Sequence, residues 1–147
     1  MLQHVVRSTV IDAPIARVWA VLRDFYSHDQ WHDAVETSRI EGGERSDQVG
    51  CVRSFTLRDG GTIRERLLAL SDYEYSCTYE ILESPMGVTN YTATLKLTPV
   101  TDGARCFAEW SAEFDCDEGR ERSLVETIGD GVFQGGFDAL KAHFSRR

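Results

Sequence analysis

The alternation of hydrophobic and polar residues predicts β-strands through the middle of the chain. Successive side chains of a strand point to opposite faces. Between residues 50 and 115, one face of most runs is apolar while the other is rich in threonine and glutamate. The connecting segments are short and turn-like, which favours antiparallel pairing of neighbouring strands. The strands predicted by this pattern cover residues 51–58, 62–71, 74–83, 88–98 and 105–115.

The first forty residues predict a strand, two short helices and another strand. Residues 4–11 and 35–40 have the composition of strands, and Pro14 suits the first turn of a helix. Residues 27–33 are polar except for Trp31 and predict a short, solvated second helix. The first helix is indicated by apolar residues at helical spacing, namely Ile15, Val18, Trp19, Leu22 and Phe25.

The end of the chain predicts one long helix over residues 118–144, because its apolar residues form a stripe at helical spacing. A glycine inside a helix costs roughly 0.8–1 kcal/mol relative to alanine. Either the helix kinks or breaks at its glycines, or these small residues let it lie close to the sheet or leave space beneath it. We favour the second explanation, because Phe133 and Phe137 alternate with the glycines and are expected to surround an opening. The glycines concerned are Gly129, Gly131, Gly135 and Gly136.

Length and charge narrow the classes of protein to which the chain can belong. With 147 residues it is long enough for one domain, residues 1–147, with a sizeable core. Its net charge of -8 argues against binding to nucleic acid or to an anionic membrane surface. No segment approaches the roughly 20 apolar residues of a transmembrane helix. We therefore expect a cytoplasmic protein without stable membrane association.

The cysteines and histidines form no pattern typical of a metal site or a catalytic nucleophile. His28 and His32 are four residues apart, but no third metal ligand is evident. Neither a P-loop nor a dinucleotide-binding fingerprint is present. We expect no metal and no cofactor, while a contact from His32 to a ligand remains open. We also expect free thiols at all four cysteines, Cys51, Cys77, Cys106 and Cys116.

Two ionisable residues lie on strand faces that are otherwise apolar. Arg53 shares its face with Phe55, and Glu65 shares its face with Ile63. The glycines between the two strands predict a hairpin, and a turn centred on Gly60 places Phe55 opposite Glu65 with Arg53 as its diagonal neighbour. A charge on an apolar face is unfavourable unless it is paired. The two residues therefore form either a structural ion pair or the polar part of a cavity.

Several segments, taken in order, form a known pattern: residues 11–19, Trp31, residues 50–53 with 65–67, Tyr91 and residues 109–111. Over the whole chain this pattern resembles the START-like superfamily, also called SRPBCC, and most of all its polyketide cyclase/dehydrase-like branch. The resemblance implies an α+β helix-grip fold. In that fold a curved antiparallel sheet of about seven strands wraps around a long C-terminal helix, encloses a cavity, and has two short helices between its first two strands.

The resemblance leaves three functions open, because a fold by itself does not select a function. The first is binding of a small, mostly apolar molecule such as a lipid, a polyketide-like or an aromatic compound, with Arg53 as the anchor for an acidic or carbonyl group. The second is a cyclase- or dehydratase-like enzyme in which Glu65 and Arg53 are the catalytic candidates. The third is a protein-interaction module with a filled core, which would contact a partner through residues 84–88.

The residues expected to contact a ligand combine these charged groups with aromatic side chains. A small-molecule site is typically apolar with a few convergent polar groups. We expect Trp31 to lie at the mouth of the cavity and the other aromatic residues to form its wall. The predicted ligand-binding residues are Trp31, Arg53, Phe55, Glu65, Tyr79, Tyr91, Trp110, Phe133 and Phe137.

Overall fold

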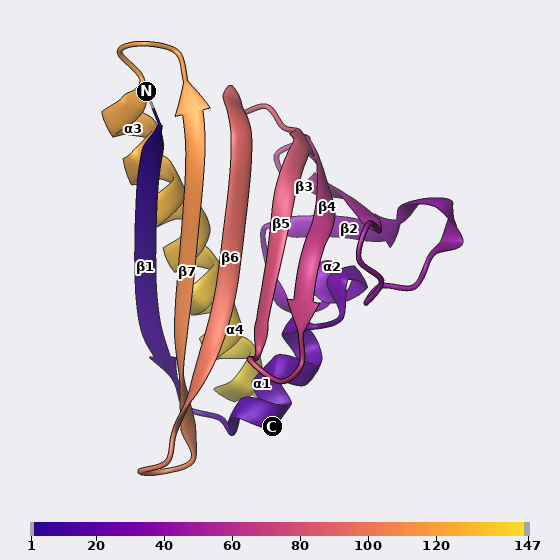
Figure 1. Cartoon of the computed structure of the whole chain (residues 1–147), viewed down its shortest axis with the longest axis vertical. Coiled ribbons are helices and arrows are strands. Elements are labelled where there is room, and N and C mark those ends of the chain that lie inside the picture. Colours follow the sequence, from indigo (N-terminus) through magenta and orange to yellow (C-terminus); the bar gives the residue numbers. More distant parts are fainter. Residues whose placement is uncertain (1, 146–147) are drawn as a thin grey trace.

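A seven-stranded antiparallel sheet curves around a long C-terminal helix in the computed structural model, which describes residues 2–145 (Figure 1). The strand order β1-β7-β6-β5-β4-β3-β2 places β1 and β2 at the two edges. The predicted helix-grip fold is therefore confirmed. The strands are β1 (Gln3–Ile11), β2 (Val35–Ile40), β3 (Val52–Leu57), β4 (Thr62–Ser71), β5 (Ser76–Glu83), β6 (Val88–Val100) and β7 (Arg105–Cys116).

Short helices connect β1 to β2, as predicted. They are α1 (Ile15–Leu22), the 3-10 turn η1 (Phe25–Ser27) and α2 (His28–Trp31), and a second 3-10 turn, η2 (Glu41–Gly43), follows β2. The first helix ends at Leu22, so the prediction that Phe25 extends it is wrong. Phe25 is nevertheless buried, because the chain turns inward after Asp24, whose side chain accepts a hydrogen bond from the backbone N–H of Tyr26.

The C-terminal helix runs without a break through α3 (Glu121–Glu126), a π-helical segment η3 (Thr127–Phe133) and α4 (Gln134–Ser145). The predicted alternative of a break at the glycines is therefore wrong, although the helix changes to π-helical geometry in the segment that contains Gly129 and Gly131. A Cβ atom at Gly136 would lie 2.6 Å from Cζ3 of Trp110, so this glycine allows close approach to the sheet. At Gly131 and Gly135 a Cβ would meet nothing within 4 Å, so these two leave open space beside the helix.

The hairpin between β3 and β4 has a different register from the predicted one. Arg53 lies directly opposite Glu65, and Phe55 lies opposite Ile63. The turn begins at Leu57, whose carbonyl accepts a hydrogen bond from the N–H of Gly60 over 2.9 Å. The centre of the turn therefore precedes Gly60. Gly60 takes the left-handed conformation, with φ of 98°, that closes such a turn. The register moves by two residues, so every side chain keeps its predicted face.

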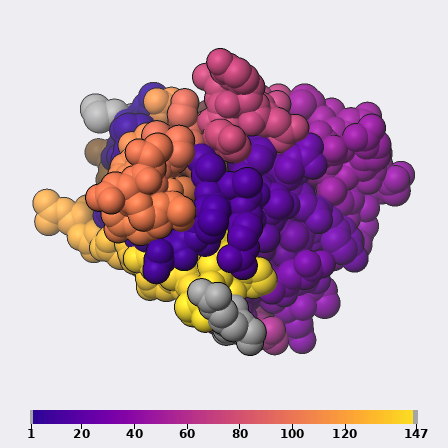
Figure 2. Space-filling view, turned by 90° about the horizontal axis from the view of Figure 1, so that it is seen from below, coloured from indigo at the N-terminus to yellow at the C-terminus, as the bar shows by residue number. Residues whose placement is uncertain are grey.

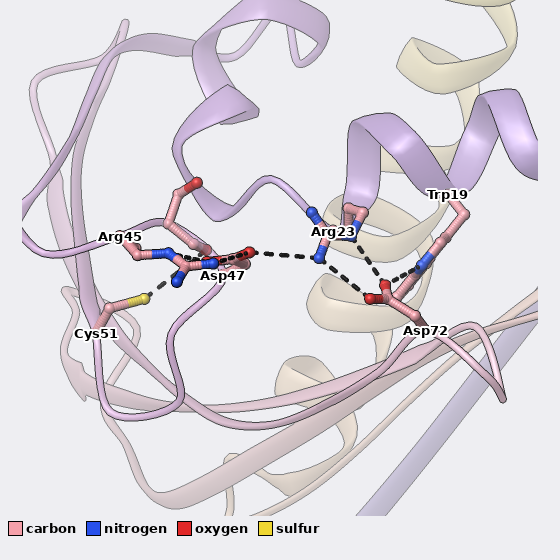
Figure 3. A network of polar contacts seen from close by, with 7 residues as sticks. Trp19, Arg23, Arg45, Asp47, Cys51 and Asp72 are labelled. Atoms are coloured by element: carbon pink, nitrogen blue, oxygen red, sulfur yellow. Dashed lines mark hydrogen bonds and ion pairs between the residues drawn. The ribbon is translucent and has the colours of Figure 1, made fainter.

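Helix α1 covers the lower end of the barrel-like sheet, between the turn that joins β4 to β5 and the turn that joins β6 to β7 (Figures 1 and 2). A polar network fixes it there (Figure 3). Asp72 in the β4–β5 turn accepts hydrogen bonds from Nε1 of Trp19 and Nε of Arg23, each over 2.8 Å. Arg23 also reaches Asp47 over 3.4 Å, which ties the segment between η2 and β3 to the same helix. This end of the molecule is thereby closed.

The cysteines are free, as predicted, and Cys51, Cys77 and Cys106 are buried. They behave as small apolar residues of the core. In the part of the chain that the structure describes, no helix is both long and apolar enough to cross a bilayer.

Candidate functional site

A cavity of about 360 Å³ lies between the concave face of the sheet and the C-terminal helix. Val132 of the π-helical segment η3 completes an inner wall that is formed mainly by apolar residues on the inward faces of β2 to β7. Strand alternation places them there, since every second side chain of a strand points inward. The aromatic members are Phe55, Tyr79, Tyr91 and Trp110, and the aliphatic ones are Val35, Leu57, Ile63, Ile81 and Val132.

Four separate segments contribute the exposed residues at the rim of the cavity. They are the connection from α2 to β2, the β3–β4 turn, the β5–β6 turn and the π-helical segment η3. Because three of the four are turns or connections, the rim belongs to the more variable part of the fold. The exposed rim residues are Ala34, Asp59, Pro85, Thr127 and Gly131.

Arg53 and Glu65 form a buried ion pair at the inner end of the cavity. Nε of Arg53 donates to Oε1 of Glu65 over 3.1 Å, and Nη2 contacts the same oxygen. Nη1 of Arg53 donates to the carbonyl of Phe25 over 3.4 Å, and the guanidinium carbon lies 3.9 Å from the centre of the Phe25 ring. Every nitrogen of the guanidinium is therefore bound within the protein.

The two partners of this pair face different spaces. Glu65 lines the large cavity, whereas Arg53 lines a small hollow of about 20 Å³ beside it, which is too small for an organic ligand. This hollow shares His28, Tyr79 and Trp110 with the cavity. Oε2 of Glu65 accepts no hydrogen bond from the described residues, and the residue as a whole is only 5% exposed. Burial raises the pKa of Glu65, and the nearby Arg53 only partly opposes this effect. The cavity thus contains a carboxylate oxygen with unused hydrogen-bonding capacity.

Three aromatic residues bring polar atoms to the cavity wall. Nε1 of Trp110 donates to the hydroxyl of Tyr79 over 3.1 Å, which satisfies the buried indole. The ring of Tyr91 stacks on Phe114 with their centres 6.0 Å apart. The Tyr91 hydroxyl forms no hydrogen bond with any other group in residues 2–145. Tyr91 and Glu65 therefore supply unpaired polar groups to the wall, as does His28, whose Nδ1 is buried without a hydrogen-bond partner among the described residues.

Four of the predicted contact residues, Trp31, Arg53, Phe133 and Phe137, lie outside the lining of the large cavity. Trp31 is buried beside the small hollow with Arg53 and does not reach the rim. Phe133 and Phe137 are completely buried, with ring centres 4.6 Å and 5.7 Å from that of Trp110. They pack behind Trp110 and hold the wall in position. The other predicted residues, Phe55, Glu65, Tyr79, Tyr91 and Trp110, are brought together around the cavity.

His28 is a site residue that the sequence reasoning missed. The predicted solvated helix is wrong at this position, because His28 is 7% exposed and its ring lies 4.6 Å from that of Phe55. Burial, with Arg53 and His32 nearby, holds the pKa of His28 well below its usual value, and burial also lowers the pKa of His32. Both imidazoles are therefore neutral at neutral pH. His28 precedes the buried Trp31 by about one helical turn, so the two residues share one face of the helix. This spacing was the signal in the sequence that could have indicated the burial of His28.

Other lining residues were also absent from the predicted set. Ile63 shares its strand face with Glu65, so alternation alone was enough to place it in the wall. Met86 and Gly131 lie at the rim because of how the β5–β6 turn meets the helix, and no local pattern indicated this.

Within residues 2–145, no three His, Cys, Asp or Glu side chains converge in an arrangement suited to a metal ion.

Solved structures of several bacterial proteins share this architecture. A protein from Thermobifida fusca is 31% identical, with a TM-score of 0.86 over 97% of this chain and 93% of that one. XoxI from Bacillus cereus is 29% identical, also with a TM-score of 0.86, over 97% of this chain and 96% of that one. The similarity therefore extends over nearly the full length of each protein.

A plant enzyme has the same fold at lower sequence identity. Norcoclaurine synthase from Thalictrum flavum, solved with dopamine and hydroxybenzaldehyde, is 18% identical, with a TM-score of 0.76 over 99% of this chain and 87% of that one. At this identity the likeness concerns the fold alone.

No curated protein matches the sequence. The family model described as polyketide cyclase / dehydrase and lipid transport matches residues 3–145, and the chain therefore belongs to that family.

Proposed function

We propose that the protein binds a small, mostly apolar molecule in the cavity between the sheet and the C-terminal helix. The observation that carries this proposal is the cavity itself, about 360 Å³ in volume, with four aromatic residues and one buried carboxylate in its wall. This volume is in the range of small-molecule sites. It equals the liquid volume of about a dozen water molecules, so a ligand of one or two fused rings fits.

The closed end of the molecule and the composition of the wall support the same proposal. The network around Asp72 fixes α1 over one end of the sheet, so access is from the rim side. Apolar side chains dominate the inner wall, and transfer of an apolar ligand from water to such a wall stabilises the complex by about 25 cal/mol per Å² buried. The cavity favours this proposal over the protein-interaction alternative, whose premise is a filled core.

Native mass spectrometry of protein purified from its own host is the first test. We expect a complex heavier than the polypeptide that loses a small molecule on denaturation. Titration with phenylnaphthylamine, a neutral fluorescent probe, complements this experiment. Val132→Phe adds bulk to the cavity wall and should weaken probe binding at least about tenfold, which is about 1.4 kcal/mol. Val6→Phe, the same change at an exposed position of β1, is the control.

Two results would contradict the proposal. One is an apo spectrum together with no binding of the probe. The other is equal probe affinity in Val132→Phe, Val6→Phe and the unmodified protein, because binding would then occur outside the cavity.

An enzymatic role in the same cavity is the second candidate, favoured by the unpaired Glu65 oxygen and Tyr91 hydroxyl. Glu65 would remove a proton from a carbon next to a carbonyl, while Tyr91 donates a hydrogen bond to the carbonyl oxygen. The proton moves to Oε2 and the electron pair delocalises into the enolate. Because burial raises the pKa of Glu65, it is a stronger base than an exposed glutamate. The test is deuterium exchange at the benzylic carbon of phenylacetone, which Glu65→Gln should abolish.

A further inference from the structure

We propose that the cavity selects an organic cation, an apolar or aromatic body carrying one ammonium group, which the unpaired oxygen of Glu65 holds. This inference rests on the proposed function and names the class of ligand that the same cavity takes. It replaces the expectation of an acidic ligand, which depended on Arg53.

The charges at the cavity are the first observation. Its acidic lining residues are Glu65 in the wall and Asp59 at the rim, and no lysine or arginine is among the described residues that line it. The lining histidines are neutral at neutral pH, since burial lowers the pKa of both His28 and His32. Among the lining residues an anionic ligand would therefore meet carboxylates, and Arg53 behind the wall is already paired with Glu65, whereas a cation meets opposite charges in the lining.

An adjoining hollow of about 320 Å³ continues this pattern. It shares His32, Ala34 and Gly131 with the cavity, so the two spaces meet at the α2–β2 connection and the π-helical segment. Its charged lining residues are Asp33 and Asp138, again without lysine or arginine in the described lining. A ligand approaching from this side passes carboxylates only, and like-signed clefts of this kind raise the local concentration of counter-ions.

Arginines near the rim are turned toward the backbone. Nε of Arg58 donates to the carbonyl of Asp33 over 2.6 Å. Nη2 of Arg120 donates to the carbonyl of Met86 over 2.9 Å. Neither arginine lines the cavity or the adjoining hollow. Their hydrogen bonds hold the rim segments together, and the charged groups that line the opening itself are carboxylates.

The buried ion pair presents its negative end to the cavity. Arg53 is held by Oε1 of Glu65 and by the carbonyl and ring of Phe25, on the side of the small hollow. Oε2 of Glu65, a buried residue, remains without a donor from the described residues. Burial of a carboxylate with an unsatisfied oxygen is costly. An ammonium group beside Oε2 supplies both the missing donors and a second positive charge.

The rest of the wall suits a cation as well. Phe55, Tyr79, Tyr91 and Trp110 surround the same space. Aromatic faces attract ammonium groups through the negative charge density of the ring, an effect that grows when the ion leaves water. Aromatic rings next to one carboxylate therefore favour a positively charged group over a neutral hydroxyl and disfavour a carboxylate.

Three probes with one common body test the inference. Naphthylethylamine, naphthylethanol and naphthylacetate have the same bicyclic ring and a two-carbon arm, and they end in an ammonium, a hydroxyl and a carboxylate. Isothermal titration calorimetry gives their dissociation constants. We expect the amine to bind at least about tenfold more tightly than the alcohol, and the alcohol at least about tenfold more tightly than the acid. Chemical-shift changes at Ile63 and Tyr91 should place the bound amine in the cavity.

Glu65→Gln should remove the difference between amine and alcohol while leaving the affinity of the alcohol within about twofold. The glutamine carbonyl can still accept from Arg53, which helps the variant to fold, and circular dichroism checks this. Glu113→Gln, which removes the same charge from an exposed position of β7, should keep the preference for the amine. The comparison of the three probes on the unmodified protein tests the inference even when Glu65→Gln does not fold.

The outcomes separate this inference from the proposed function. Equal binding of amine and alcohol, or tighter binding of the acid, would overturn the cationic ligand but keep a binding cavity. Absence of binding by all three probes and by phenylnaphthylamine would overturn both. A preference for the amine that persists in Glu65→Gln would refute the role of its carboxylate.

Discussion

Replacement of Gly136 by alanine should destabilise the protein, although alanine is the better helix former. The new Cβ would lie 2.6 Å from Cζ3 and 3.1 Å from Cη2 of Trp110. Carbon atoms pack best about 3.5–4.0 Å apart. The ring or the helix must therefore move by roughly 1 Å to restore contact at this distance.

The Trp110 ring is poorly placed to make that movement. Phe133 stacks on it with ring centres 4.6 Å apart, and Phe137 lies 5.7 Å away. Its indole nitrogen is held by Tyr79 over 3.1 Å. Overpacking of such a core lowers the free energy of unfolding by about 1–3 kcal/mol. Exchange of a helical glycine for alanine raises the free energy of unfolding by about 0.8–1 kcal/mol. Because the ring is held from several sides, we expect a net loss of about 1–2 kcal/mol for Gly136→Ala.

The neighbouring residue provides a matched control. At Gly135 a Cβ meets nothing within 4 Å, so Gly135→Ala should stabilise the protein by about 0.5–1 kcal/mol. The difference between the two variants contains no helix-propensity contribution and reports packing alone.

Urea unfolding followed by circular dichroism gives both free energies. In thermal unfolding, each kcal/mol corresponds to about 2–4 °C for a chain of this length. Equal stabilisation by the two substitutions would refute the close approach of helix and sheet. Phenylnaphthylamine binding supplies a second readout, because displacement of Trp110 toward the cavity should weaken the binding of this probe only in Gly136→Ala.

Two further predictions concern buried ionisable groups. Arg53→Met leaves Glu65 buried without its partner and should cost about 3–5 kcal/mol. The double variant Arg53→Met/Glu65→Leu should recover most of this loss in urea unfolding, and no recovery would show that the charges are not coupled. His28 stays neutral in the folded protein but binds a proton in the unfolded chain below its ordinary pKa of 6.5. Stability should therefore fall as the pH drops below 6.5, by up to about 1.4 kcal/mol per pH unit for one such group. His28→Phe should make this slope shallower, and an unchanged slope would contradict the explanation.

The sequence determined the strands and their faces, because side-chain alternation is a local property of extended backbone. The segment 62–71 was predicted with the bounds that β4 has, and β2 matched its prediction equally well. Glu65 and Arg53 were recognisable as unusual charges on apolar faces. The resemblance to a known superfamily supplied the order of the layers and the position of the C-terminal helix.

The tertiary structure decided the contacts that depend on more than one element. The register at Glu65 followed from the position of the turn before Gly60, which alternation does not fix. Burial of His28 followed from the packing of α2 against Phe55 in β3.

The tertiary structure also decided which charge faces the ligand space. Both members of the ion pair lie on inward strand faces, so the sequence treated them alike. The carbonyl and ring of Phe25, which belongs to the distant turn η1, hold the guanidinium away from the cavity and leave a carboxylate oxygen within it. Alternation is determined along one strand, whereas the partners of a charge are determined by segments that only the fold brings together.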